Sequence, residues 1–269
     1  ADRATQEAAI EEELSYLQGR YDEAKKTLSE EALNTGASLR EALYFTPEDI
    51  HKEDGAARYV DYGDTRSLTQ QELADMLARL SDPSSSLFDI DQGRIGDCHL
   101  LASLNAYNQT EAGRRYLASL ITPHYGADGK VDGFYVDFPG FDRNHKRVFV
   151  QDVLVHGNGN DTHADIASIF EKAFVQSHMG GTRGKIPTWG ASGSLSALTM
   201  GDISGKATYP TVNLGINRES LKTAAIDAVT TGRPVVAESS PFAGDAQVTA
   251  NGSREDITIA SSHVYTVAA

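Results

Sequence analysis

Residues 91–104 read DQGRIGDCHLLASL and contain Cys98, the only cysteine of the 269-residue chain. Gly93 and Gly96 permit a tight, irregular loop in which the backbone can lie close to a ligand. The residues that follow, CHLLASLNAYNQT, contain no glycine or proline and carry apolar side chains at helical spacing. We therefore predict a loop that leads directly into a helix, with the thiol at the start of that helix.

A thiol in this position has the surroundings of a nucleophile. The positive end of the helix dipole favours the thiolate, which is the reactive form. Unpaired N–H groups of the first helical turn can stabilise an oxyanion, and Gln92 supplies a side-chain amide on the same loop. We expect Asp97 to cap the helix by accepting N–H hydrogen bonds. The competing interpretation is a buried structural thiol, because cysteine often packs as a small hydrophobic residue.

An activated thiol also needs an imidazole base, and the chain has eight histidines. His263 stands at the head of HVYTVAA, an apolar segment that we predict to be a strand and therefore a rigid mount. His99 follows the cysteine on the predicted helix, so its side chain points about 100° away from the sulfur. These local patterns alone make His263 about as good a candidate for the base as all the other histidines together.

Composition excludes some classes of function. The net charge is −14, from 38 acidic and 24 basic residues, which argues against nucleic acid as a partner because phosphate repels such a surface. No apolar run approaches the roughly 20 residues of a membrane span. We expect a soluble protein with no visible signal segment, secreted or delivered to a target cell, although the compartment stays open. The first residue is Ala1, which we interpret as a processed product or an excised fragment.

The pattern divides the chain into two parts. Residues 1–81 are acidic and predicted helical, DPSSS at 82–86 breaks the pattern, and 87–269 mixes strands with helices, so we predict an α+β fold with a helical N-terminal extension. The predicted helices are 2–33, 46–55, 67–82 (capped by Ser67 or Thr69), the helix after Cys98, 164–179, a short one near Leu195, and 217–234; the predicted strands are 133–138, 147–155, 235–239 and 263–269.

The cysteine stretch resembles a family signature. QGRIGDCHLLASL is similar to the Gln-Gly-x-x-Gly-Asp-Cys-Trp-Leu-Leu-Ala pattern of calpain-type cysteine proteases. Three later stretches resemble that family in the same order: KRVFVQDVLV its Val-x-Val-Asp-Asp-x-Leu strand, ASIFEKAFVQ its Leu-Leu-Glu-Lys-Ala-Tyr-Ala helix, and SSHVYTV its Gly-His-Ala-Tyr-Ser-Val strand. The resemblance covers about residues 87–269 and leaves the first 80 residues without a counterpart.

The resemblance implies a papain-like fold in which the nucleophile helix packs on an antiparallel sheet. Cys98 would be the nucleophile, His263 the general base and later the acid, and Gln92 the oxyanion-hole donor. The implied reaction is the hydrolysis of protein or peptide substrates through a thioester. We expect a cysteine endopeptidase, the protease domain of a larger bacterial secreted effector or toxin, with an inhibitor or immunity protein as a possible partner.

The chain departs from the family pattern in places. His99 replaces the tryptophan after the cysteine, and Ser262 replaces the glycine before His263. The family's third catalytic residue is an asparagine in an Asn-Pro-Trp segment on the strand after the histidine. We expect it past Ala269, which would make the protease core C-terminally incomplete, or its role is taken by another group.

Two other functions remain open. Papain-like folds also host transglutaminases and deamidases, and fold alone does not choose between these reactions. A non-catalytic calpain-like binding module is the third interpretation. No cofactor is implied. Calcium remains an option because the loops 126–133 and 158–165 are rich in Asp and Asn, but neither matches EF-hand spacing, and ordinary turns are the preferred interpretation.

Overall fold

The computed structural model describes residues 62–141, 146–159, 163–179, 186–188, 196–206, 208, 218–239, 246–249, 256–259 and 263–268. The helices predicted at 2–33 and 46–55 lie outside these residues.

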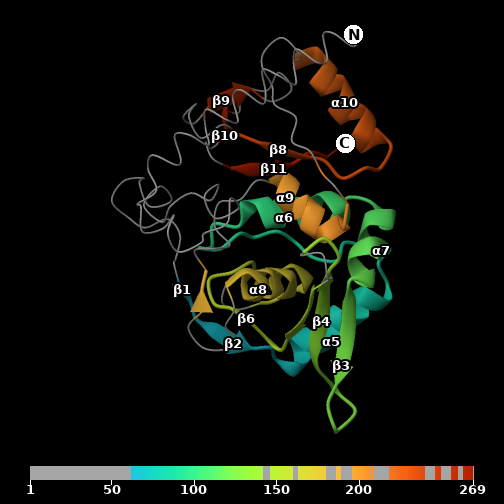
Figure 1. Ribbon diagram of the computed structural model, residues 1–269, viewed down its shortest axis with the longest axis vertical. Helices are drawn as coiled ribbons and strands as arrows, with labels where there is room; N and C mark the ends of the chain where they lie inside the picture. Colours follow the sequence, from blue (N-terminus) through green and yellow to red (C-terminus); the bar gives the residue numbers. More distant parts are fainter. Residues whose placement is uncertain are drawn as a thin grey trace, which may run out of the picture.

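The described residues form an α+β structure whose strands pair in small antiparallel sheets. The sheets are β3–β4–β5 and the pairs β1–β7, β2–β6, β8–β11 and β9–β10 (Figure 1). In chain order the elements are β1 (Tyr62–Gly63), β2 (Thr65–Ser67), α5 (Gln70–Ser81), α6 (Cys98–Asn108), α7 (Glu111–Ser119), β3 (Ile121–Tyr125), β4 (Val131–Phe138), β5 (Lys146–Val150), β6 (Asp152–Leu154), α8 (Ile166–Met179), β7 (Ile186–Pro187), α9 (Ser196–Ser204), α10 (Arg218–Thr230), β8 (Val236–Glu238), β9 (Ala246–Thr249), β10 (Asp256–Ile259) and β11 (Val264–Thr266).

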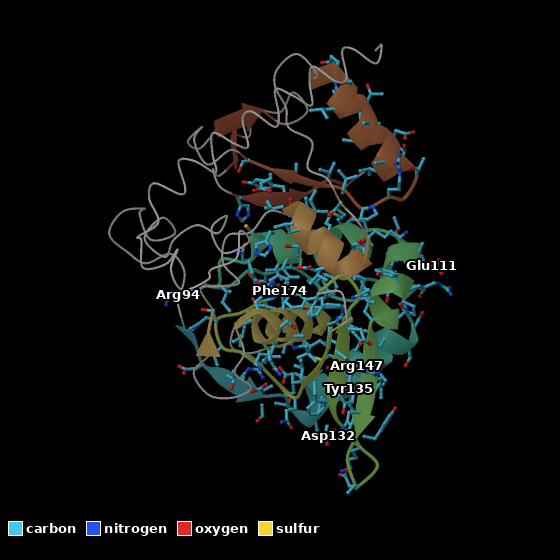
Figure 2. All side chains as sticks on the ribbon, in the orientation of Figure 1. Arg94, Glu111, Asp132, Tyr135, Arg147 and Phe174 are labelled. Carbon is cyan, nitrogen blue, oxygen red and sulfur yellow. The ribbon has the colours of Figure 1, made fainter. Side chains whose placement is uncertain are left out.

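Helix α8 forms the centre of the main hydrophobic core. Its aromatic rings Phe170 and Phe174 lie edge-on to Phe138 of β4, with centroids 6.1 and 6.0 Å apart. Strand β4 alternates, because Phe134, Val136 and Phe138 are buried while Tyr135 faces outward. Figure 2 shows Phe174 in the interior and Tyr135 beside Arg147 on the outer face of the sheet, where the guanidinium lies 4.8 Å from the ring centroid.

The same helix carries a buried ion pair. Lys172 Nζ lies 3.1 Å from Asp152 Oδ1 on β6 and donates to Gln176 Oε1 at 3.0 Å. Neither partner of the ion pair reaches solvent appreciably, so each charge depends on the other for its stabilisation. This pair joins the two segments KRVFVQDVLV and ASIFEKAFVQ.

Helix α6, which begins with Cys98, is buried on nearly every side. Nine of its eleven residues are buried. It lies with α9 between α8 and the β8–β11 pair (Figure 1). His99 contacts both helices: its ring lies 5.7 Å from Phe174 on α8, and its Nδ1 is 2.7 Å from Thr199 Oγ1 on α9. On another side, Thr266 Oγ1 of β11 donates to the Ala102 carbonyl at 3.0 Å.

Most of the predicted helices that fall on described residues are confirmed. Thr69 rather than Ser67 caps α5, and Gly232 follows the end of α10 with a positive φ of 75°. The short strands β1, β2, β7, β9 and β10 were not predicted, because two to four residues are too few to show a period. Helix α7 was missed too: Gly113 interrupts its helical pattern, and it is required there because a Cβ would collide with the Tyr107 carbonyl.

The residues just before the 82–86 break pack into the same core as those after it. Strand β2 pairs with β6, and Leu73 and Met76 of α5 are buried in the main core cluster. In the described part of the chain, no helix is long and apolar enough to cross a membrane.

Glu72 joins three segments at this junction. Its carboxylate accepts hydrogen bonds from the Thr69 backbone at 2.8 Å, the Ala164 backbone at 2.8 Å and the Arg66 guanidinium at 2.7 and 3.0 Å. Burial alone would raise the pKa of Glu72, but Arg66 and the backbone donors lower it to about 2. The ionised carboxylate therefore stabilises the fold at neutral pH.

We predict that Glu72→Gln lowers the free energy of unfolding by about 2–3 kcal/mol at pH 7. The pKa is depressed from its usual 4.5 to about 2 in the folded state. The contribution is therefore complete above about pH 4.5 and is lost as the pH falls towards 2. Urea denaturation at several pH values measures both effects. Glu111→Gln, which removes an exposed pair with Arg115, is the control and should change stability by less than about 0.5 kcal/mol. An equally small effect of Glu72→Gln would contradict the prediction.

Candidate active site

The loop 91–97 lies against a second loop at 156–159. The Arg94 N–H donates to the His156 carbonyl at 2.7 Å. A Cβ at Gly93 would collide with the carbonyls of His156 and Gly157, so only glycine permits this approach. This close contact explains one of the two glycines that define the cysteine motif.

The second loop in turn rests on α8. Asn158 Oδ1 accepts from the Asp91 N–H at 2.9 Å, and the Asn158 N–H donates to Glu171 Oε2 at 3.0 Å. A Cβ at Gly157 would collide with the same carboxyl of Glu171. The position of the motif loop is therefore set by hydrogen bonds that lead to one buried acid on α8.

Asp97, the residue before Cys98, and Glu171 form a buried carboxyl pair. Asp97 is 0% exposed and Glu171 is 1% exposed. Within the described residues, neither oxygen of Asp97 meets a well-aligned donor, and Glu171 Oε1 also lacks one. The prediction that Asp97 caps α6 through its side chain is wrong: its φ and ψ are −104° and 30°, and its carboxyl makes no capping hydrogen bond. The side chain points into the interior towards Glu171 instead.

The two acids favour a shared proton. Burial raises the pKa of Asp97 to about 7, against the hydrogen bond from Glu171, which lowers it. Burial and the charge of Asp97 raise the pKa of Glu171 well above its usual value, although the Asn158 N–H lowers it. Asp165 adds a further negative charge near Glu171. Burial and the mutual repulsion of the two carboxylates therefore favour protonation of the pair.

Cys98 is the first residue of α6, as the sequence predicts, and its side chain faces β11. It is 8% exposed and packs in a small cluster with Ala102 and Val264, against which Val236 of β8 also lies. The thiol is thus held by the strand that follows His263.

The surroundings of Cys98 disfavour the thiolate. Burial raises its pKa to about 11; the nearby acids Asp97 and Glu238 raise it as well, while the hydrogen bonds from Val264 and His99 lower it. The helix N-terminus favours the thiolate, as expected, but burial and the two neighbouring carboxyls act in the opposite direction. The helix dipole contributes typically about 0.3–1 kcal/mol at a helix end.

His263 lies directly before β11 and is half-buried. Its backbone is held in place by Ser239. The His263 N–H donates to Ser239 Oγ at 2.9 Å, and the His263 carbonyl accepts from the Ser239 N–H at 2.9 Å. Its ring lies edge-on to Tyr265, with centroids 4.9 Å apart. Because the next residue, Val264, contacts the sulfur, the structure brings Cys98 and His263 onto facing elements.

Gln92 lies on the motif loop and is half-buried. Its Nε2 donates to the Ile95 carbonyl at 2.9 Å, so one amide N–H is used to hold the loop. The amide has a second N–H, which leaves it capable of a further hydrogen bond.

Sequence reasoning missed two acids of this site. Glu171 lies in a helix that is amphipathic by pattern, and nothing in that pattern shows that a charged residue faces the core. Glu238 follows the apolar run VVA at 235–237, and a charge at the end of such a strand was the available signal. That Glu238 lies near Cys98 follows from strand pairing, which the sequence does not show: Glu238 lies opposite Val264 in the β8–β11 register.

No group of three or more His, Cys, Asp or Glu side chains among the described residues is placed to hold a metal ion. The loop 126–133 forms the turn between β3 and β4, where the Gly126 N–H donates to the Lys130 carbonyl at 2.8 Å. The loop 158–165 is described only in part.

Comparison with known proteins adds no family assignment. No protein-family model matches the chain, and no curated protein matches it significantly. The calpain-type resemblance therefore depends on the motifs themselves.

We predict that Glu171→Gln removes a pH dependence of stability. In the wild type the folded-state pKa of Asp97 is raised from 3.8 to about 7. The contribution of Asp97 to the free energy of unfolding should therefore be complete below about pH 4 and should fall as the pH rises towards 7. A glutamine donates a permanent N–H to Asp97, so the slope in this window should decrease. Chemical denaturation between pH 4 and 8 measures it.

The control is Glu219→Gln, which changes an exposed acid on α10 and should leave the slope unaltered. A wild-type slope that persists in Glu171→Gln would show that the Asp97–Glu171 pair is not its source.

Proposed function

We propose that this protein is a calpain-like cysteine endopeptidase with a papain-like fold, in which Cys98 is the nucleophile and His263 the general base. The observation that carries the proposal is the packing of the buried Cys98 side chain against Val264, the residue that follows His263. It joins the two most specific motif stretches, which are 165 positions apart in the chain, at the nucleophile itself.

The position of α6 supports the proposed fold. The helix that carries the thiol is buried, with α8 on one side and the β8–β11 pair on the other (Figure 1). A papain-like protease needs this arrangement, because the nucleophile comes from a central helix and the base from a strand of the facing sheet. The remaining stretches of the resemblance, on β5–β6 and α8, form the core beneath the helix.

The first half of the proposed reaction acylates Cys98. His263 takes the thiol proton, and the sulfur attacks the carbonyl carbon of the scissile peptide bond. The oxyanion that forms accepts hydrogen bonds from the Cys98 N–H at the start of α6 and from the Gln92 amide. Collapse of this intermediate breaks the C–N bond, and the imidazolium gives its proton to the leaving amine.

The second half releases the acyl group. His263 takes a proton from water, the hydroxide attacks the thioester carbonyl, and the C–S bond breaks to give a carboxylic acid and the free thiol. The three hydrogen bonds between His263 and Ser239 hold the backbone that carries the imidazole. An asparagine past residue 269, as the resemblance implies, would orient the ring further. The substrate would be protein or peptide, and an inhibitory partner such as an immunity protein stays a prediction.

We predict that Cys98→Ala abolishes hydrolysis of a casein-like substrate and that His263→Ala lowers kcat by at least about a thousandfold. His124→Gln is the matched control, because His124 pairs with Asp132 on the outer face of the β3–β4–β5 sheet. Mass spectrometry of the products should show new peptide termini. Cleavage that persists in Cys98→Ala would end the proposal.

The same measurement separates the other two functions. Glutamine residues that become glutamate, or cross-links without new termini, would assign the site to a deamidase or transglutaminase. The absence of turnover, with Cys98 alkylated no faster than free cysteine, would favour the non-catalytic binding module.

We also predict that Gln92→Ala lowers kcat by about 10²–10³ with little change in KM, because an oxyanion donor acts only in the transition state. Steady-state kinetics on a fluorogenic peptide measure the two constants. Gln109→Ala at the other end of α6, where the amide donates to Asn105, is the control. A rise in KM with kcat intact would show that Gln92 binds the ground state instead.

A further inference from the structure

The side of β8 that faces α6 carries one apolar and one acidic residue. Val236 packs against the cluster of Cys98 and Val264. Glu238 is two residues further along the same strand and therefore points to the same side. It also lies opposite Val264 in the antiparallel register, so its side chain extends from the strand beside the nucleophile.

The carboxylate of Glu238 is held in place and reaches solvent. Ser196, the first residue of α9, donates its hydroxyl to Glu238 Oε2 at 3.1 Å and its backbone N–H to the same oxygen at 3.4 Å. Glu238 is nevertheless exposed. A fixed, solvent-accessible carboxylate can bind a cationic group with little further loss of side-chain conformational entropy.

The charge of Glu238 acts on the nucleophile. Both Glu238 and Asp97 raise the pKa of the Cys98 thiol. Asp97 is fully buried and faces Glu171, so it is not available to a substrate. Glu238 is therefore the acid of the two that a bound substrate can contact and neutralise.

We propose that Glu238 is a specificity-determining residue that binds a lysine or arginine side chain of the substrate close to the scissile bond. This inference rests on the proposed function, because it gives that same site its substrate class. Amines and guanidinium groups are the side chains that an exposed, fixed carboxylate selects. A cation bound at Glu238 also offsets the negative field at the thiol, so the preferred substrate eases formation of the thiolate that attacks it.

The test uses peptidyl acyloxymethyl ketones, in which the Cys98 sulfur displaces the acyloxy group as a carboxylate and forms a thioether. Pairs of probes carry lysine or norleucine at the first, second or third residue from the electrophile. In the wild type, lysine at one of these positions should raise the second-order labelling rate by about five- to tenfold over norleucine. In Glu238→Gln this preference should disappear.

A second readout separates recognition from a structural role. Iodoacetamide is small and uncharged, and it should alkylate Cys98 faster in Glu238→Gln, by about threefold or more, because one charge that disfavours the thiolate is gone. Glu111→Gln, which changes an exposed acid on α7 that pairs with Arg115, should alter neither rate (Figure 2 shows Glu111).

Each other outcome has a definite meaning. Labelling without a lysine preference, or a preference that survives in Glu238→Gln, overturns this inference and leaves the protease assignment intact. A fall in both the probe rate and the iodoacetamide rate in Glu238→Gln shows a structural role and also overturns it. Alkylation by iodoacetamide without labelling by any peptidyl probe overturns the proposed function and this inference together.

Discussion

The buried acids Asp97 and Glu171 come together where the motif loop meets the start of α6. Asp97 is the residue before Cys98, and it is held inside the protein by an acid of the central helix α8. Glu171 also holds the loop at 156–159 through the Asn158 N–H. The motif loop packs against that loop, with Gly93 close to its carbonyls and the Arg94 N–H donating to the His156 carbonyl. A single buried acid thus fixes both the loop that precedes the thiol and the first turn of α6.

This arrangement has an electrostatic consequence at the thiol. Burial of Cys98, the adjacent residue Asp97 and Glu238 on the paired strand all raise the pKa of the thiol. In the proposed reaction, His263 must then supply the base at the moment of attack rather than hold a preformed ion pair. A protease with a protonated resting thiol reacts slowly with small electrophiles, and its reactivity depends on what the substrate brings to the site.

The sequence predicts the helices of this protein better than its strands or its electrostatics. The stripe of α5, the cap at Thr69 and the helix that starts at Cys98 follow from local patterns and are confirmed. Strand β3 was missed because Pro123 and its short length conceal it. The depth of Asp97 could not be predicted: a residue before a helix normally caps it, and only the packing of α8 against the loop turns its carboxyl inward.

The residues of the candidate site also divide into those that local sequence patterns predict and those that only the packing reveals. The motif identified Cys98, His263 and Gln92 as candidates, because residue types at fixed spacing are visible in a sequence. Glu171 and Glu238 are brought to the thiol by helix packing and by strand register, neither of which a single sequence contains. The effect of these acids on the thiol could not be predicted for the same reason, since the sequence shows the helix dipole but not the two acids.

The central claim is that the Cys98 sulfur and the His263 imidazole meet across one groove. Dibromoacetone, a short reagent with two alkylating carbons, tests this directly, because it can join the two side chains only if they lie within a few bond lengths of each other. The account predicts one intramolecular link between Cys98 and His263, found by peptide mass spectrometry and absent from His263→Ala. A reagent attached to Cys98 alone, or linked from Cys98 to a different residue, would contradict it.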